Sequence, residues 1–198
     1  MSSLEIVAVI VNILGVWLTA QRIRWCWPVS VVAVLLYAWI FFGVKLYSDM
    51  LLQLVFAVLQ GYGWWRWSSG QSVGGKVRVE RLPLREAVLS LLAGLLGAVL
   101  LGSLMHLFTD AAVPWVDALL TAFSLVASFW AARKYLASWG LWIILDVAYV
   151  GLFLYKDLQL TAALYAGFVV LAGYGLHAWR KDLRHQERPL AAAAEATA

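Results

Sequence analysis

The sequence predicts an all-α membrane protein of seven transmembrane helices, arranged as two parallel three-helix repeats around one connecting helix, a 3+1+3 order. The first observation is composition: 64% of the 198 residues are hydrophobic, mean hydropathy is +0.82, and 13% are charged. Ordinary soluble domains have roughly 25% charged residues. The second observation is a series of apolar runs long enough to cross a membrane, and the third is an internal repeat.

Seven apolar runs have about the 17 to 25 residues that a membrane-crossing helix needs. They lie at 4–21, 27–43, 46–66, 86–108, 114–132, 138–155 and 158–179. Pro28 and Pro114 fall at first-turn positions, where a missing backbone N–H costs nothing. No basic region precedes the first run and no small-residue cleavage site follows it, so we expect a retained helix and not a signal peptide.

The repeat becomes visible when the sequence is shifted by 112 residues without a gap. The shift aligns Trp27 with Trp139, Tyr37 with Tyr149, Phe41 with Phe153, Leu46 with Leu158, Phe56 with Phe168, Trp67 with Trp179, and Gly61-Tyr62-Gly63 with Gly173-Tyr174-Gly175. Three-helix units in tandem would be inverted, and the unmatched helix at 86–108 restores a parallel relation. Transporters with such repeats hold substrate between the halves, near the middle of the membrane. The predicted units are a bundle at 1–67, a cytoplasmic loop and connector at 68–112, a second bundle at 113–179 and a tail at 180–198.

The distribution of Lys and Arg predicts the orientation. With the N-terminus outside, 13 of the 15 Lys and Arg residues fall on the inner side, where positive residues are retained. The C-terminus is therefore expected in the cytoplasm. The Gly-, Ser- and Arg-containing stretch 68–85 is interpreted as a solvated loop, and the tail from Arg180 as a frayed end. The net charge of +4 comes from short clusters between apolar runs and indicates no nucleic-acid partner.

The residues give little support to an enzyme or a metalloprotein. Cys26 is the single cysteine, and no His or Cys cluster has metal-ligand spacing. The sequence shows no Ser-His-Asp order, no paired catalytic carboxylates and no Gly-rich phosphate loop. We therefore expect neither catalysis nor a cofactor or metal.

Asp146 is the most informative candidate for a substrate site, because it lies inside the apolar run 138–155. An ionisable group at mid-helix costs roughly 2.5 to 3.5 kcal/mol in a membrane, so it normally faces protein or a water-filled path. Trp142 and Tyr149 share its helix face, which favours a lumen position for all three. The other polar candidates at membrane depth are Asn12, Asp49, Gln53, Gln60, Thr121, Ser124, Thr161 and Tyr165.

Each candidate has a structural alternative. Thr121, Ser124 and Thr161 can serve as small residues at helix contacts, and Asn12 and Gln53 as interhelical hydrogen-bonding groups. Asp49 can complement a helix dipole, and Asp146 can hydrogen-bond to a neighbouring helix. A headgroup belt is the favoured place for Trp64, Trp65, Trp67 and Trp179, which lie at predicted inner helix ends.

Two segments resemble the PnuC family of bacterial vitamin transporters. They are YSDMLLQLVFAVLQGYGWWRW in the first half and WGLWIILDVAYVGLFLYKDLQLTAALYAGFVVLAGYGLHAW in the second, and their order and spacing are similar over nearly the whole chain. The resemblance implies a fold like that of SWEET sugar transporters, in the bacterial cytoplasmic membrane. It also implies facilitated diffusion of nicotinamide riboside, trapping by a cytoplasmic kinase, and a homo-oligomer such as a trimer.

The residues themselves leave the substrate open. Nicotinamide riboside is a flat cation that Trp and Tyr can stack on and Asp can balance, but thiamine is also a cationic aromatic. Relatives of similar appearance are associated with thiamine, riboflavin or deoxynucleosides. The rival outside transport is a membrane scaffold whose polar residues only join helices. We therefore rank nicotinamide riboside first and thiamine second.

Overall fold

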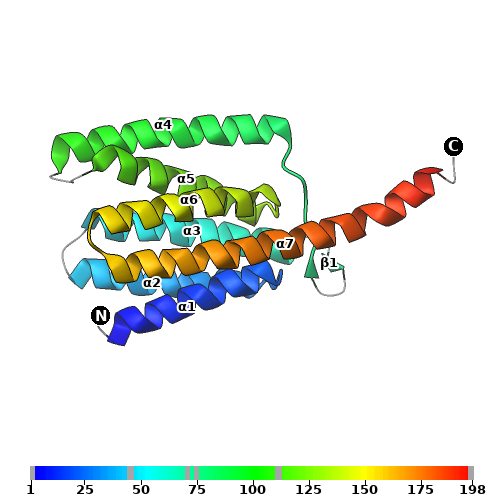
Figure 1. Ribbon diagram of the computed structural model, residues 1–198, viewed down its shortest axis with the longest axis horizontal. Coiled ribbons are helices and arrows are strands. Elements are labelled where there is room, and N and C mark those ends of the chain that lie inside the picture. Colours follow the sequence, from blue (N-terminus) through cyan, green and yellow to red (C-terminus); the bar gives the residue numbers. More distant parts are fainter. Residues whose placement is uncertain (1–2, 44–46, 70–71, 74–75, 110–112, 196–198) are drawn as a thin grey trace.

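Helices make up most of the chain in the computed structural model, which describes residues 3–43, 47–69, 72–73, 76–109 and 113–195 (Figure 1). In this part the helices are α1 Ser3–Ala20, α2 Cys26–Gly43, α3 Tyr47–Ser69, α4 Leu84–Phe108, α5 Pro114–Ala132, α6 Ala137–Tyr155 and α7 Gln159–Glu195. Two short antiparallel strands, β1 Ser72–Val73 and β2 Lys76–Val77, lie between α3 and α4. Every predicted helix is present, and all ends but one fall within three residues of the prediction.

The exception is the C-terminal end of α7, which continues as a helix to Glu195 where a frayed tail was predicted. The last turns project beyond the bundle in Figure 1. This part of the chain is rich in Arg, Lys, Leu, Gln, Glu and Ala, which are the stronger helix formers. Leu183 in the extension is buried, so tertiary packing supports at least its first turns.

Five of the helices in the described part are long and apolar enough to cross a membrane: α2, α4, α5, α6 and α7 up to Gln186. The apolar part of α1, Ile6–Ala20, is shorter. The most hydrophilic predicted span is α3, which carries Asp49, Gln53, Gln60 and Arg66. The chain is therefore a multi-pass membrane protein, while the prediction of seven spans rests on sequence for α1 and α3.

The helices form two groups and one peripheral helix (Figure 1). In the first group α2 packs on both α1 and α3, and in the second α6 packs on both α5 and α7. The groups meet where α1 contacts α7 and where α3 contacts α5. The predicted connector, α4, lies at the edge of the molecule and packs on α5.

Two tryptophan pairs, one in each group, have nearly the same geometry. The rings of Trp27 and Trp67 meet edge to face at 84° with centroids 5.4 Å apart, and those of Trp139 and Trp179 meet at 86° and 5.6 Å. Trp67 is 3% exposed and Trp179 1% exposed. The prediction of a headgroup belt is therefore wrong for these two, whereas Trp65 does lie at the surface.

A glycine allows close approach to one ring of each pair. A Cβ atom on Gly63 would come within 2.4 Å of the Trp27 ring, and one on Gly175 within 2.6 Å of the Trp139 ring. No real Cβ sits so close to an aromatic carbon. In each group the two helices therefore pack closely at a glycine that lies against a tryptophan ring. These helices are α2 and α3 in one group, and α6 and α7 in the other.

The paired tryptophans also join the two groups. Trp67 Nε1 donates a hydrogen bond of 3.2 Å to the Ala131 carbonyl at the end of α5. Trp179 Nε1 donates at 3.2 Å to the carbonyls of Thr19 and Ala20 at the end of α1. Each group thus donates to carbonyls at a helix end of the other, where the last carbonyls have no donor one turn further along the helix.

The turns after α1 and α5 are alike as well. Arg22 and Lys134 have positive φ angles of 59° and 66°, a backbone conformation that residues with a Cβ rarely adopt. Their N–H groups donate to the carbonyls of Thr19 and Ala131, each at 2.9 Å. The end of the molecule that holds these turns and the four paired tryptophans is called the basic end below.

The connection between α3 and α4 is partly buried, and in this respect the prediction of a solvated loop is wrong. Val77 and Val79 are 5% and 2% exposed. The backbone of Glu80 exchanges hydrogen bonds with the α5–α6 turn, its N–H donating to the Lys134 carbonyl at 2.9 Å and its carbonyl accepting from Leu136 N–H at 3.0 Å. Two buried valines and a paired backbone hold this segment against the bundle.

Candidate functional site

The candidate site centres on Asp146, in the middle of α6. Its side chain is 5% exposed, and the described residues offer it neither an ion pair nor a hydrogen bond. A carboxylate taken out of water without a partner costs several kcal/mol. The structural alternative for Asp146 is a hydrogen bond to a neighbouring helix, and the described residues form no such bond. The carboxylate is therefore available to a ligand that carries positive charge.

Aromatic rings from α6 and α7 form a cluster near this position. The Tyr149 ring, one turn along α6, lies 4.8 Å from the Tyr165 ring of α7. Phe153 and Phe168 extend the cluster, with centroids 5.0 and 5.6 Å from Tyr165. Tyr165 is also within electrostatic range of Asp146. The structure thus brings three predicted site residues, Asp146, Tyr149 and Tyr165, into one place.

Helix α5 adds two hydroxyl groups to the cluster. Thr121 and Ser124 lie beside the Tyr149 hydroxyl. Ser124 is 4% exposed, and its Oγ atom makes no hydrogen bond of acceptable geometry with the described residues. A buried hydroxyl without a partner is costly to leave unsatisfied. These two predicted residues therefore supply hydrogen-bonding capacity next to the aromatic rings.

Tyr37 of α2 was not among the predicted site residues, yet it lies within electrostatic range of Tyr165. It connects the first helix group to a cluster otherwise built by the second. The 112-residue shift already aligned Tyr37 with Tyr149, and this alignment was the signal that could have identified it. With Tyr37 included, both helix groups contribute aromatic side chains to the candidate site.

The remaining predicted residues are less closely connected to the cluster. Trp142 is half-buried on the same face of α6 and packs against both the tryptophan pairs and the core of α5 and α6. Thr161 is half-buried on α7. Asn12, Gln53 and Gln60 are half-buried and form no side-chain hydrogen bond in the described part of the chain. The side chain of Asp49 lies outside the described residues.

The basic end is closed beneath the site. Trp27, Trp67, Trp139 and Trp179 pack there with the valines of the α3–α4 connection in one buried cluster. Arg22 donates to the Val77 carbonyl at 3.3 Å and forms an ion pair of 2.6 Å with Asp182 of α7. Burial lowers the pKa of Arg22, and the charge of Asp182 opposes that shift. Tight packing and this ion pair hold the two helix groups together at this end.

The arrangement suits recognition of a flat cation. Aromatic rings attract a cation over their faces, by about 2 kcal/mol or more where water is excluded. An unpaired carboxylate supplies the opposite charge, and nearby hydroxyls can bond to sugar or amide groups. Among the described residues no group of three His, Cys, Asp or Glu side chains is placed to hold a metal ion.

The fold is that of a multi-pass membrane protein. A family model described as nicotinamide mononucleotide transporter matches residues 2–181, so the chain belongs to this family of transporters, of which PnuC is a member. The resemblance to PnuC proteins found in the sequence is thereby confirmed.

Two curated relatives show how the family divides. The riboflavin/roseoflavin transporter RibM of Streptomyces davaonensis is 27% identical over 185 residues, which cover 90% of this chain and 86% of RibM. The nicotinamide riboside transporter PnuC of Escherichia coli is 27% identical over 213 residues, which cover 94% of this chain and 88% of PnuC. The relatives are vitamin transporters with different substrates, at the same identity to this chain.

A crystal structure of the vitamin B3 transporter PnuC has the same fold. The TM-score is 0.72 at 23% sequence identity, over 92% of this chain and 82% of that one. The likeness establishes the arrangement of the helices.

Proposed function

We propose that this chain carries nicotinamide riboside across the bacterial cytoplasmic membrane by facilitated diffusion. The observation that supports this substrate is the buried, unpaired carboxylate of Asp146 beside the rings of Tyr149 and Tyr165. Nicotinamide riboside is a flat cation with a ribose and a carboxamide, and each part has a complementary group in the site. Riboflavin has no fixed positive charge and makes no use of the carboxylate.

The proposed architecture is a 3+1+3 parallel repeat like that of SWEET transporters. The paired tryptophans, the glycines on their rings, the matching turns and the two reciprocal contacts between helix groups all support it. Two similar bundles that meet on either side of a central site can rock against each other, which is the usual basis of alternating access.

The proposed orientation rests on the distribution of charge, and the proposed lack of ion coupling rests on the titratable groups. The basic end faces the cytoplasm in this proposal, because Lys and Arg concentrate on that side. The described residues place no acid pair or chain of titratable groups across the membrane for proton coupling. Substrate therefore equilibrates, and phosphorylation by a cytoplasmic kinase retains it. A homo-oligomer such as a trimer is part of the family resemblance.

Ligand binding to the purified protein tests the substrate. In calorimetric titrations we expect nicotinamide riboside to bind most tightly, thiamine second, and riboflavin and neutral nicotinamide weakly. Because a ligand of the native state raises apparent stability, a thermal-shift screen provides a second readout. Binding of riboflavin alone would refute the argument from charge.

The variant Asp146→Asn separates charge from shape. We expect its affinity for nicotinamide riboside to fall about ten-fold or more, since ten-fold corresponds to about 1.4 kcal/mol. Two unit charges 4 Å apart interact by ~4 kcal/mol at an effective dielectric constant of ~20, which leaves room for such a loss. Trp67→Phe is the control: it removes a buried hydrogen bond at the basic end and should lower the melting temperature while affinity changes less.

Flux into proteoliposomes tests transport itself against the scaffold alternative. Labelled nicotinamide riboside should enter kinase-free vesicles until inside and outside concentrations are equal. Absence of flux for every vitamin and nucleoside tried, with folded protein, means that the polar residues only join helices. Uphill uptake driven by a proton or sodium gradient would contradict facilitated diffusion.

A further inference from the structure

A groove separate from the candidate site runs between α3, α4 and α5. Its volume is about 810 Å³. This lies within the range of roughly 300 to 1,000 Å³ that is usual for ligand pockets. Apolar side chains line most of it, among them Val55 and Leu59 of α3, Leu89 and Ala93 of α4, and Leu125 of α5. The groove therefore has the size and the walls of a site for an apolar ligand.

The groove exists because α4 packs on α5 and stands away from α3. Gly94, Ala98 and Gly102 form a buried stripe of small residues that brings α4 close to α5. A Cβ on Gly94 would come within 2.9 Å of Val126. No comparable packing joins α4 to α3 in the described part of the chain. The faces left open are apolar, with Val58 77% exposed, and in a membrane they meet lipid tails.

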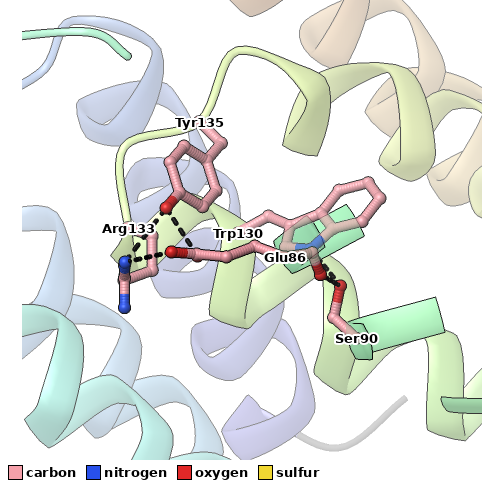
Figure 2. A network of polar contacts seen from close by, with 5 residues as sticks. All are labelled: Glu86, Ser90, Trp130, Arg133 and Tyr135. Atoms are coloured by element: carbon pink, nitrogen blue, oxygen red, sulfur yellow. Dashed lines mark hydrogen bonds and ion pairs between the residues drawn. The ribbon is translucent and has the colours of Figure 1, made fainter. Parts of the chain in front are cut away.

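One end of the groove is polar, with groups from α4 and from the end of α5. Arg133, at the end of α5, donates from Nη2 to Glu86 Oε1 of α4 at 2.7 Å, and the Tyr135 hydroxyl donates to Glu86 Oε2 at 2.6 Å (Figure 2). Ser90, one turn along α4, accepts a hydrogen bond from Trp130 Nε1 at 2.8 Å. Both carboxylate oxygens of Glu86 are therefore already engaged.

Arginine charge remains unpaired at this end. Arg66 lies one turn beyond Tyr62, a groove residue, on the same face of α3. The Nε atoms of Arg66 and Arg133 are buried and have no hydrogen-bond partner among the described residues. With Glu86 neutralised by Arg133, the charge of Arg66 is left over. An anionic group at the mouth of the groove would balance this charge.

We propose that this groove is a binding site for one phospholipid, with an acyl chain between α3, α4 and α5 and the phosphate against Arg66 and Arg133. Guanidinium groups match the geometry of phosphate oxygens and bind them through two parallel hydrogen bonds. The lipid fills a space that would otherwise separate α3 from α4. Bound in this way it links the first helix group to the connector, which belongs by packing to the second.

A second copy of this chain is a poorer occupant on grounds of charge. Copies in one membrane have the same orientation, so their basic ends lie at the same depth. A helix from a neighbouring copy would bring Lys and Arg toward Arg66 and Arg133, where an anion is needed. A phospholipid supplies an apolar chain and a phosphate at the matching depth, in the leaflet that we propose faces the cytoplasm.

Native mass spectrometry of the purified protein with added phosphatidylglycerol tests the site. Ala93→Phe fills the groove, and Arg66→Gln removes the left-over charge without adding volume. We expect each variant to need at least ten-fold more phosphatidylglycerol for half occupancy of one lipid. The matched controls are Leu92→Phe, at an exposed position outside the groove, and Arg85→Gln, an exposed cation in the first turn of α4. Both controls should bind as the unaltered chain does.

The outcomes separate lipid from other occupants. Equal lipid retention in Arg66→Gln and in Arg85→Gln overturns the assignment of the phosphate, even if Ala93→Phe does not fold. Cross-linking between copies through a cysteine placed at Val58, in protein that carries no bound lipid, shows a protein interface instead and also overturns the proposal. Vitamin binding serves as the folding control, because no groove residue belongs to the candidate substrate site.

Discussion

The two helix groups are nearly the same at the basic end and different at the candidate site. At the basic end Trp27, Trp67 and Gly63 have counterparts of equal geometry in Trp139, Trp179 and Gly175. At the site, Tyr149 has its counterpart in Tyr37, but Asp146 corresponds to Val34 and Tyr165 to Gln53. Packing positions are thus shared, and ligand-facing positions are not.

The difference follows from what each region must contact. At the basic end the two helix groups pack on each other, and each repeats the pattern of the other. The same set of residues can therefore serve both sides of the contact. A substrate such as a riboside has a charged ring at one end and a sugar at the other, so two identical faces cannot both complement it. Exchange of residues between the halves should therefore change little at the basic end and alter ligand binding at the site.

The largest effect is expected from Asp146→Val, which installs at the site the residue of the first half. Removal of an unpaired buried carboxylate should stabilise the folded chain by up to roughly 2.5 to 3.5 kcal/mol, the cost of an ionisable residue at mid-membrane. Affinity for nicotinamide riboside should be lost at the same time. Unfolding in mixed micelles and calorimetric titration measure the two quantities.

The reciprocal change is the control for this comparison. Val34→Asp places a carboxylate in the half that has Gln53 at the position of Tyr165, so it should destabilise the chain without adding an affinity for cations. A loss of stability in Asp146→Val would show that Asp146 is part of the packing, and the proposed site would then lose its central residue.

Equal losses on both sides are expected from Gly63→Ala and Gly175→Ala. Each new methyl group would overlap a tryptophan ring, at 2.4 and 2.6 Å before relaxation. Overpacking of this kind costs about 1 to 3 kcal/mol. Chemical unfolding of the two variants should give similar values, because the two tryptophan pairs have the same geometry.

Gly61 and Gly173 provide matched controls within the same repeat. A Cβ at either position meets nothing within 4 Å. Alanine there should stabilise helices α3 and α7 by roughly 0.5 to 1 kcal/mol, since glycine is the less favourable residue in a helix interior. If Gly63→Ala costs stability and Gly175→Ala does not, the two halves are not equivalent at this end.

Much of this could be predicted from sequence, because helix length and the repeat depend on local patterns of hydrophobicity. The burial of Trp67 and Trp179 could not, since an indole at a helix end suits a lipid headgroup and a packed core equally well. The contacts of Val79 depend on the α5–α6 turn, more than fifty residues away. Tyr37 was missed because its role depends on packing between the groups.

The smallest effect concerns the two turns with positive φ angles, and it separates backbone strain from side-chain contacts. The left-handed conformation costs a residue with a Cβ roughly 1 to 2 kcal/mol, and glycine avoids this cost. Lys134→Gly should therefore stabilise the chain by about 1 kcal/mol. Arg22→Gly should give no gain, because it also removes the ion pair with Asp182 and the hydrogen bond to Val77.

The pH dependence of Lys134→Gly provides a second check. Burial lowers the pKa of Lys134 below its ordinary 10.5, with Glu80 opposing the shift and Arg66 adding to it. The folded state therefore disfavours the charged form, and this cost is present at neutral pH and disappears as the pH rises through the lowered pKa toward 10.5. The advantage of Lys134→Gly over the unaltered chain should accordingly be largest near neutral pH and shrink in alkaline buffer. Unfolding free energies measured from pH 7 upward would give a constant difference if only backbone strain were relieved.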